Sequence, residues 1–139
     1  MLARVSIFAP LNKEQLSNLA QLVVRRSFAR GTVIIREGDT DAALYVIIIG
    51  DVAVTKRGTS GTGELQLSTL HAGDFFGEMA LIDGSPRSAS VTAVTATECL
   101  VLTRWVFNTT LRSDPLIAVA MLPVLSRRIR ETDERRLLP

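Results

Sequence analysis

The sequence predicts a mainly β fold with flanking helices, in which an antiparallel β-barrel or jelly roll follows one helix and precedes others. Short β-branched and aliphatic runs recur between residues 32 and 103, as is typical of compact antiparallel barrels. Gly-Asp pairs at 38–39, 50–51 and 73–74 separate these runs and indicate turns. Helical spacing of apolar residues occurs before this region and again after it.

The chain has 139 residues, a length that predicts one domain spanning 1–139. We expect the barrel at about 25–103 and the C-terminal helices at about 104–137. The first helix begins in "PLNKEQLSNLAQLVVRRSF", where Asn12 and Gln15 have the spacing of a capping box. Its apolar positions follow helical spacing: Leu16, Leu19, Ala20 and Val23.

Five segments carry the predicted strands. In "LYVIIIGDVAVTKRG" a turn at Gly50 and Asp51 separates two of them. In "GELQLSTLHAGD" Leu65, Leu67 and Leu70 alternate with polar residues, and "TSGTG" (59–63) before it predicts a flexible hairpin tip. The other strand segments are "TVIIREG", "SASVTAV" and "TECLVLT".

Helical patterns return with "RWVFNTTLR", where Trp105 is expected to pack the final helices against the barrel. The last helix begins at Asp114 as N-cap and Pro115 as first helical residue. Pro123 predicts either a kink or a break, since an internal proline costs about 3 kcal/mol. Residues at spacings of four form one apolar stripe: Ile117, Met121, Leu125 and Ile129.

Composition excludes several classes of function. One cysteine forms neither an internal disulfide nor a cysteine metal cluster, so we expect a reducing, cytoplasmic compartment. The apolar run at 42–49 is too short to cross a bilayer, and no membrane contact is expected. Segment 127–136 carries the whole net charge of +2, which argues against direct nucleic-acid contact by this chain. With one histidine and no recognisable catalytic set, we expect no enzyme, no metal and no cofactor.

Segment 73–93, "GDFFGEMALIDGSPRSASVTA", combines features of an anion site. Gly77 permits a sharp turn or close approach to a ligand, and a following helical turn would present unpaired amides. Arg87 supplies a guanidinium for a phosphate, and Glu78 fits a ligand that also carries a ribose hydroxyl. The alternative is an ion pair between Glu78 and Arg87 that ties a loop to the barrel. Small residues leave space for the ligand: Ala80, Ser88 and Ala89.

These residues carry a family resemblance. "FGEMALIDGSPRSASVTA" resembles the phosphate-binding cassette of the cyclic nucleotide-binding domain, in the form found in bacterial regulators of the catabolite-activator type. "VIIREGDTDAALYVIIIGDV" is similar to the earlier strand-and-glycine signature of the same family. The resemblance implies the cyclic nucleotide-binding fold and a regulatory domain that binds cAMP, or cGMP, and signals by movement of its C-terminal helix.

The resemblance also implies roles for individual residues. By match, Glu78 takes the ribose hydroxyl, Arg87 grips the cyclic phosphate and Ser88 adds a phosphate contact. The purine-contacting threonine matches Thr132, but the next residue is Asp133 where the bacterial activator has serine, which leaves the choice of base open. Gly77, Met79 and Ala80 fall where backbone contacts to the sugar-phosphate are made.

The resemblance further implies a homodimer through the C-terminal helix, with the apolar stripe from Ile117 to Ile129 as its expected seam. The bacterial regulators continue into a helix-turn-helix domain, whereas this sequence stops at "RRLLP". We therefore expect no helix-turn-helix domain here, and DNA contact only through an absent domain. Two alternatives remain: a degenerate domain used for docking or dimerisation, and the sensor fragment of a DNA-binding regulator.

Overall fold

The structure, a computed structural model, describes residues 2, 5–57 and 63–137. It divides into two compact units. One, here called the strand unit, comprises Leu22–Phe107. The other, the helical unit, comprises Met1–Gln21 and Asn108–Pro139.

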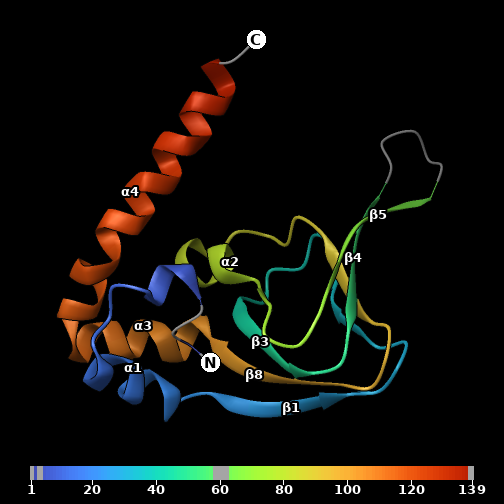
Figure 1. The fold of residues 1–139 in the computed structure, drawn as a ribbon, viewed down its shortest axis with the longest axis horizontal. Helices are drawn as coiled ribbons and strands as arrows, with labels where there is room; N and C mark the ends of the chain where they lie inside the picture. Colours follow the sequence, from blue (N-terminus) through green and yellow to red (C-terminus); the bar gives the residue numbers. More distant parts are fainter. Residues whose placement is uncertain (1, 3–4, 58–62, 138–139) are drawn as a thin grey trace. The chain divides into compact units, whose positions relative to one another are not determined.

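The strand unit contains two four-stranded sheets among its described residues, with every pairing antiparallel (Figure 1). The predicted antiparallel β fold is thereby confirmed. The first sheet has the order β1-β8-β3-β6, formed by Val24–Phe28, Thr97–Thr103, Ala43–Ile49 and Phe75–Phe76. The second has the order β2-β7-β4-β5, formed by Val33–Ile35, Ser90–Ala93, Val52–Arg57 and Glu64–Leu70.

The core of the strand unit gathers apolar side chains from both sheets. β3 is buried without interruption from Ala43 to Ile47, as expected for an inner strand covered on both faces. Tyr45 on β3 stacks on Phe76 of β6, with ring centroids 4.9 Å apart and planes 4° from parallel. The buried cluster consists of Ile35, Ala43, Tyr45, Ile47, Val52, Phe76, Val91, Cys99 and Val101.

Strand β5 forms as the alternating pattern predicted, but its leucines are not all inside. The side chains of Leu65 and Leu67 are 62% and 51% exposed, while Leu70 is half-buried and packs against the core. β5 is an edge strand paired only with β4 among the described strands, so no neighbouring strand covers it on the other side. Most of the predicted hairpin tip, residues 58–62, lies outside the described residues.

The first helix, α1 (Lys13–Ala20), has the predicted capping box: Gln15 N–H donates to Asn12 Oδ1 at 2.8 Å, and Asn12 N–H donates to Gln15 Oε1 at 3.0 Å. The helical spacing extended to Val23, but the helix ends at Ala20. The chain enters β1 at Val24, where five residues pair with β8. This strand ladder takes precedence over the helical pattern. Ahead of α1 lies the 3₁₀ turn η2 (Ser6–Phe8).

Helix α3 (Arg104–Ser113) begins in the strand unit and ends in the helical unit. The expectation for Trp105 was wrong, because its side chain is 77% exposed. The buried residues of this helix are Phe107 and Thr110, three positions apart on one face. Trp105 stands two positions from Phe107, which turns its side chain toward the opposite face.

Helix α4 (Pro115–Leu137) starts at the predicted proline and runs through Pro123 without a break. Its predicted seam is largely core: Ile117 is fully buried and Met121 is 2% exposed, and α4 contacts η2 within the helical unit. These two residues are therefore not a seam with another molecule. Leu125 is half-buried, and the Ile129 side chain lies outside the described residues. Among the described residues, no helix combines the length and hydrophobicity needed to span a bilayer.

Candidate functional site

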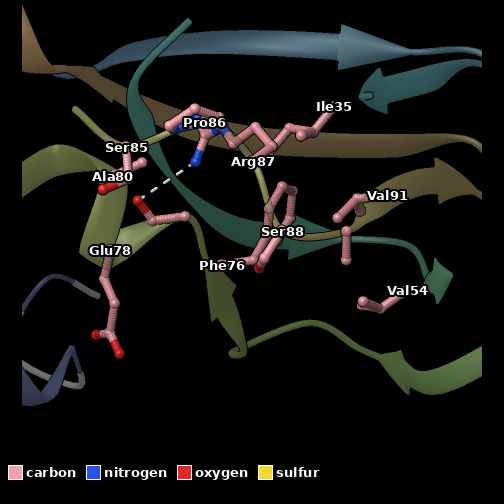
Figure 2. Close-up of a pocket in the computed structure, with 12 residues that line it drawn as sticks. Ile35, Val54, Phe76, Glu78, Ala80, Ser85, Pro86, Arg87, Ser88 and Val91 are labelled. Carbon is pink, nitrogen blue, oxygen red and sulfur yellow. Dashed lines mark hydrogen bonds between the residues drawn. The ribbon is translucent and has the colours of Figure 1, made fainter. Parts of the chain in front are cut away.

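A cavity of about 350 Å³ lies in the strand unit beside helix α2 (Glu78–Asp83) (Figure 2). Its walls come from the end of β6, from α2, from the segment that leads into β7, and from β2, β4 and β7. In Figure 1 this helix lies next to β3, with which it is in contact. The cavity is lined by Ile35, Val54, Phe76, Gly77, Glu78, Ala80, Ser85, Pro86, Arg87, Ser88, Ala89 and Val91.

Two glycines with left-handed backbone conformation flank α2. Gly77 precedes the helix with φ 86°, and Gly84 follows it with φ 69° and donates its N–H to Ala80 O at 2.8 Å. A Cβ at position 77 would lie 2.7 Å from Arg87 Nη1 and would also clash with the carbonyl oxygen of Ala43. Only glycine therefore allows the chain to turn into α2 while Arg87 occupies its position.

Arg87 is fixed through both its backbone and its side chain. Its N–H donates to Asp39 O, and its carbonyl accepts from Gly38 N–H, each at 2.8 Å. Its Nη2 donates to Ala43 O at 2.9 Å, and its Nη1 lies 3.5 Å from Gly77 O, the contact dashed in Figure 2. The side chain is only 5% exposed. The guanidinium is therefore held at the wall of the cavity, next to the start of α2.

The charge of Arg87 is only partly compensated. Its hydrogen-bond acceptors are neutral carbonyls, and its Nε has no hydrogen-bond partner among the described residues. The nearest carboxylate oxygen paired with it is Asp41 Oδ1, 4.0 Å from Nε. Burial lowers the pKa of Arg87, while the negative charge of Asp41 acts in the opposite direction. Because a guanidinium stays protonated in proteins, this wall presents a fixed positive charge suited to an anion.

Glu78 lines the same cavity but has a different orientation. Figure 2 shows its carboxylate directed away from the Arg87 guanidinium, although both residues flank the start of α2. This orientation does not fit the alternative of a Glu78–Arg87 ion pair. In this geometry Arg87 is already placed to contact an anion, whereas the Glu78 carboxylate would have to turn to contact an adjoining sugar.

The structure brings six of the eight predicted site residues to this cavity, namely Gly77, Glu78, Ala80, Arg87, Ser88 and Ala89. Met79 belongs to α2, but its side chain lies outside the described residues. Thr132 belongs to α4 of the helical unit, and its side chain is likewise outside the described residues.

Sequence reasoning missed the apolar wall of the cavity. Val91 on β7 is in register with Ile35 on β2 and with Val54 on β4, so the three form a row across the second sheet. Phe76 completes this wall from the first sheet. Alternation within each strand gives a signal for an inward face, but it does not reveal which residues of different strands are neighbours. Ser85 and Pro86 were also missed, although they immediately precede Arg87.

Comparison with known proteins identifies the family. The family model described as the cyclic nucleotide-binding domain matches residues 25–114, well over half of the chain. The chain belongs to the cyclic nucleotide-binding domain family. The matched range includes every lining residue of the cavity. Residues 76–93 are called the cassette below.

Similar proteins include a cyclic AMP receptor protein and a protein kinase regulatory subunit. The chain is 36% identical to the cyclic AMP receptor protein of Thermus thermophilus, over 91% of this chain and 58% of the relative. It is 38% identical to a cAMP-dependent protein kinase regulatory subunit of Dictyostelium discoideum, over 77% of this chain and 33% of the relative. The chain thus spans between a third and three fifths of these relatives.

Solved structures show the same fold. The N-terminal domain of a transcriptional regulator from Streptomyces coelicolor superposes with a TM-score of 0.83 at 32% identity, covering 93% of this chain and 91% of that one.

Among the described residues, no group of three or more His, Cys, Asp or Glu side chains is arranged to hold a metal ion.

Proposed function

We propose that this cyclic nucleotide-binding domain binds cAMP by preference, with cGMP as the other candidate, in the cavity beside α2. The observation that carries the proposal is the buried guanidinium of Arg87 at the cavity wall, next to the start of α2. Relatives that are named for cAMP support the same ligand class. A cavity of about 350 Å³ falls within the usual range for small-molecule sites.

The phosphate is the part of the ligand that this wall recognises. Arg87 and the Ser88 hydroxyl contact its oxygens, and backbone amides in the first turn of α2 add further donors. Arg87 uses one N–H on Ala43 O and one on Gly77 O, so a guanidinium with five donors retains others for a ligand.

The sugar and base occupy the rest of the cavity. Glu78 accepts the ribose hydroxyl after its carboxylate rotates toward the ligand. The row formed by Ile35, Val91 and Val54 offers an apolar surface to the sugar-phosphate and purine rings. Small side chains at Ala80 and Ala89 leave room for the ligand.

Binding is read out as a shift between two conformations. The ligand draws the cassette inward, and the C-terminal helix closes over the base, with Thr132 as the purine contact. A ligand shifts such an equilibrium only by the difference between its affinities for the two states. The signal then passes to a further domain or partner.

The same proposal includes a homodimer through α4. Its exposed face carries three large apolar side chains, Leu116, Val119 and Leu122, which are 67%, 58% and 59% exposed. They stand three residues apart and so form a stripe along the helix. This stripe replaces the buried one of Ile117 and Met121 as the candidate seam.

Calorimetric titration of the chain with cAMP and with cGMP tests the proposal, with 5′-AMP as the uncyclised control. We expect saturable binding of a cyclic nucleotide and much weaker binding of 5′-AMP, whose monoester phosphate carries a different charge and shape. If neither cAMP nor cGMP gives heat of binding at about 1 mM ligand, the proposed function is rejected. A dissociation constant above that concentration corresponds to less than about 4 kcal/mol of binding free energy.

A further inference from the structure

Asp41 is the carboxylate that the structure pairs with Arg87. Its Oδ1 lies 4.0 Å from Arg87 Nε, which is longer than a hydrogen bond. The Asp41 side chain is 59% exposed, whereas that of Arg87 is only 5% exposed. A buried cation at the wall of the proposed phosphate site thus faces a solvated anion.

This arrangement is built by the backbone. Gly38 and Asp39 each form a hydrogen bond of 2.8 Å with the backbone of Arg87, which holds residues 38 and 39 alongside the cassette. Ala43, two residues beyond Asp41, accepts from Arg87 Nη2. Asp41 therefore lies between two backbone contacts to Arg87 that precede it, at Gly38 and Asp39, and one that follows it, at Ala43.

The charge of Asp41 reaches the groups around the cavity. It raises the pKa of Arg87 against the opposing effect of burial, and it adds to burial in raising the pKa of Tyr45. Tyr45 stacks on Phe76, which lines the cavity. An anionic ligand held by Arg87 would therefore enter a region where a fixed negative charge is already felt.

We propose that Asp41 sets the affinity of this site, as counter-ion of Arg87 when no nucleotide is bound and as a repulsive neighbour of the phosphate when one is. The inference rests on the proposed function. A phosphate that reaches Arg87 compensates its charge and makes Asp41 redundant there. The two anions then repel each other, so Asp41 weakens binding while it stabilises the nucleotide-free form. Asp41 acts through Arg87 and is a positioning residue rather than a ligand contact.

Asp41→Asn tests this inference, with Asp39→Asn as the matched control. Both replacements remove one exposed negative charge from the same loop, but only Asp41 is paired with the Arg87 guanidinium. Asp39 contributes its backbone carbonyl, which the substitution keeps. We expect Asp41→Asn to bind cAMP roughly 2- to 5-fold more tightly than Asp39→Asn at low salt, a size typical of a partly solvated charge. The difference should shrink at about 1 M NaCl, where charges are screened within about 3 Å.

Thermal unfolding without ligand tests the role of Asp41 independently of nucleotide binding. In the nucleotide-free chain, Asp41→Asn should lower the melting temperature more than Asp39→Asn does, and this excess should vanish in an Arg87→Met background. If the wild type binds cAMP but the two Asn variants bind it equally well, or Asp41→Asn binds it more weakly, the inference is overturned and the proposed function stands. If none of the three binds a cyclic nucleotide, the proposed function and the inference both fail.

Discussion

Arg87 Nη2 donates a hydrogen bond of 2.9 Å to the carbonyl oxygen of Ala43, which joins the cassette to the first residue of β3. The same carbonyl stands where a side chain at Gly77 would have to fit. The start of α2, the guanidinium and the start of β3 therefore meet at one point. A change at any of the three alters the surroundings of the positive charge.

Gly77→Ala should destabilise the chain more than Gly31→Ala. Both glycines have φ near +87°, where a non-glycine residue costs about 1–2 kcal/mol. At Gly31 an added Cβ meets nothing within 4 Å, whereas at Gly77 it would lie 2.7 Å from Arg87 Nη1. We therefore expect a loss in the free energy of unfolding of about 1–2 kcal/mol for Gly31→Ala, with about 1–3 kcal/mol more for Gly77→Ala from overpacking. Urea denaturation followed by circular dichroism measures both.

The Gly31 variant serves as the control for backbone strain alone. Equal losses in the two variants would mean that the contact between position 77 and Arg87 carries no energy. If Gly77→Ala also binds cAMP more weakly while Gly31→Ala does not, the displaced guanidinium explains the difference.

Arg87→Ala should reduce cAMP affinity by a hundredfold or more. The substitution removes at least two charge-assisted hydrogen bonds to the phosphate, together worth about 3 kcal/mol. Arg112→Ala is the matched control, since it removes the same charge from an exposed position in the last turn of α3. Calorimetry on both variants gives the comparison. Unchanged binding by Arg87→Ala would show that the phosphate does not bind at this wall of the cavity.

Arg87→Lys refines the result. Lysine keeps the charge but presents a single ammonium in place of a planar fork. A large loss in this variant would show that geometry matters as well as charge, and full retention would show that charge alone suffices.

Local sequence signals predicted the parts of the fold that depend on neighbouring residues. The Asn12–Gln15 capping box, the turn at Gly50 and the helical start at Pro115 are each decided within a few positions. The segment 76–93 was recognisable for the same reason, because the left-handed glycine, the short helix and the arginine follow one another in the chain.

The remaining features depend on contacts between distant residues. Helix α1 stops three residues before the last position of its apolar pattern, Val23, because β1 pairs with β8, a strand about seventy residues later. The apolar wall of Ile35, Val91 and Val54 exists only through the register of three strands. Periodicity found the stripe of α4 but did not indicate that Ile117 packs inside its own unit.

Cys99 should be unreactive in the folded chain at pH 8. Its side chain is fully buried, and burial raises the pKa of the thiol to about 11. At three pH units below that pKa, about one thiol in a thousand is ionised, and the thiolate is the reactive species. Labelling with an aromatic disulfide reagent should be slow without denaturant and rapid in urea. The folded chain should react faster as the pH rises toward 11, and rapid labelling at pH 8 would contradict the buried position.

Ile117 and Leu122 should contribute very differently to the stability of the chain, although both lie on α4. Ile117 is fully buried, so Ile117→Ala should lower the free energy of unfolding by about 2–5 kcal/mol. Leu122 is 59% exposed, so Leu122→Ala should change it by less than about 0.5 kcal/mol.

In sedimentation experiments the exposed stripe should control association. A dimer of the wild-type chain should dissociate in the double variant Leu116→Glu with Leu122→Glu, because charges would replace two large apolar side chains at the seam. Glu14→Ala on α1 is the control, since it alters an exposed residue on another helix. A wild-type chain that stays monomeric at high concentration, or a double variant that dimerises as well as the wild type, would place any dimer seam elsewhere.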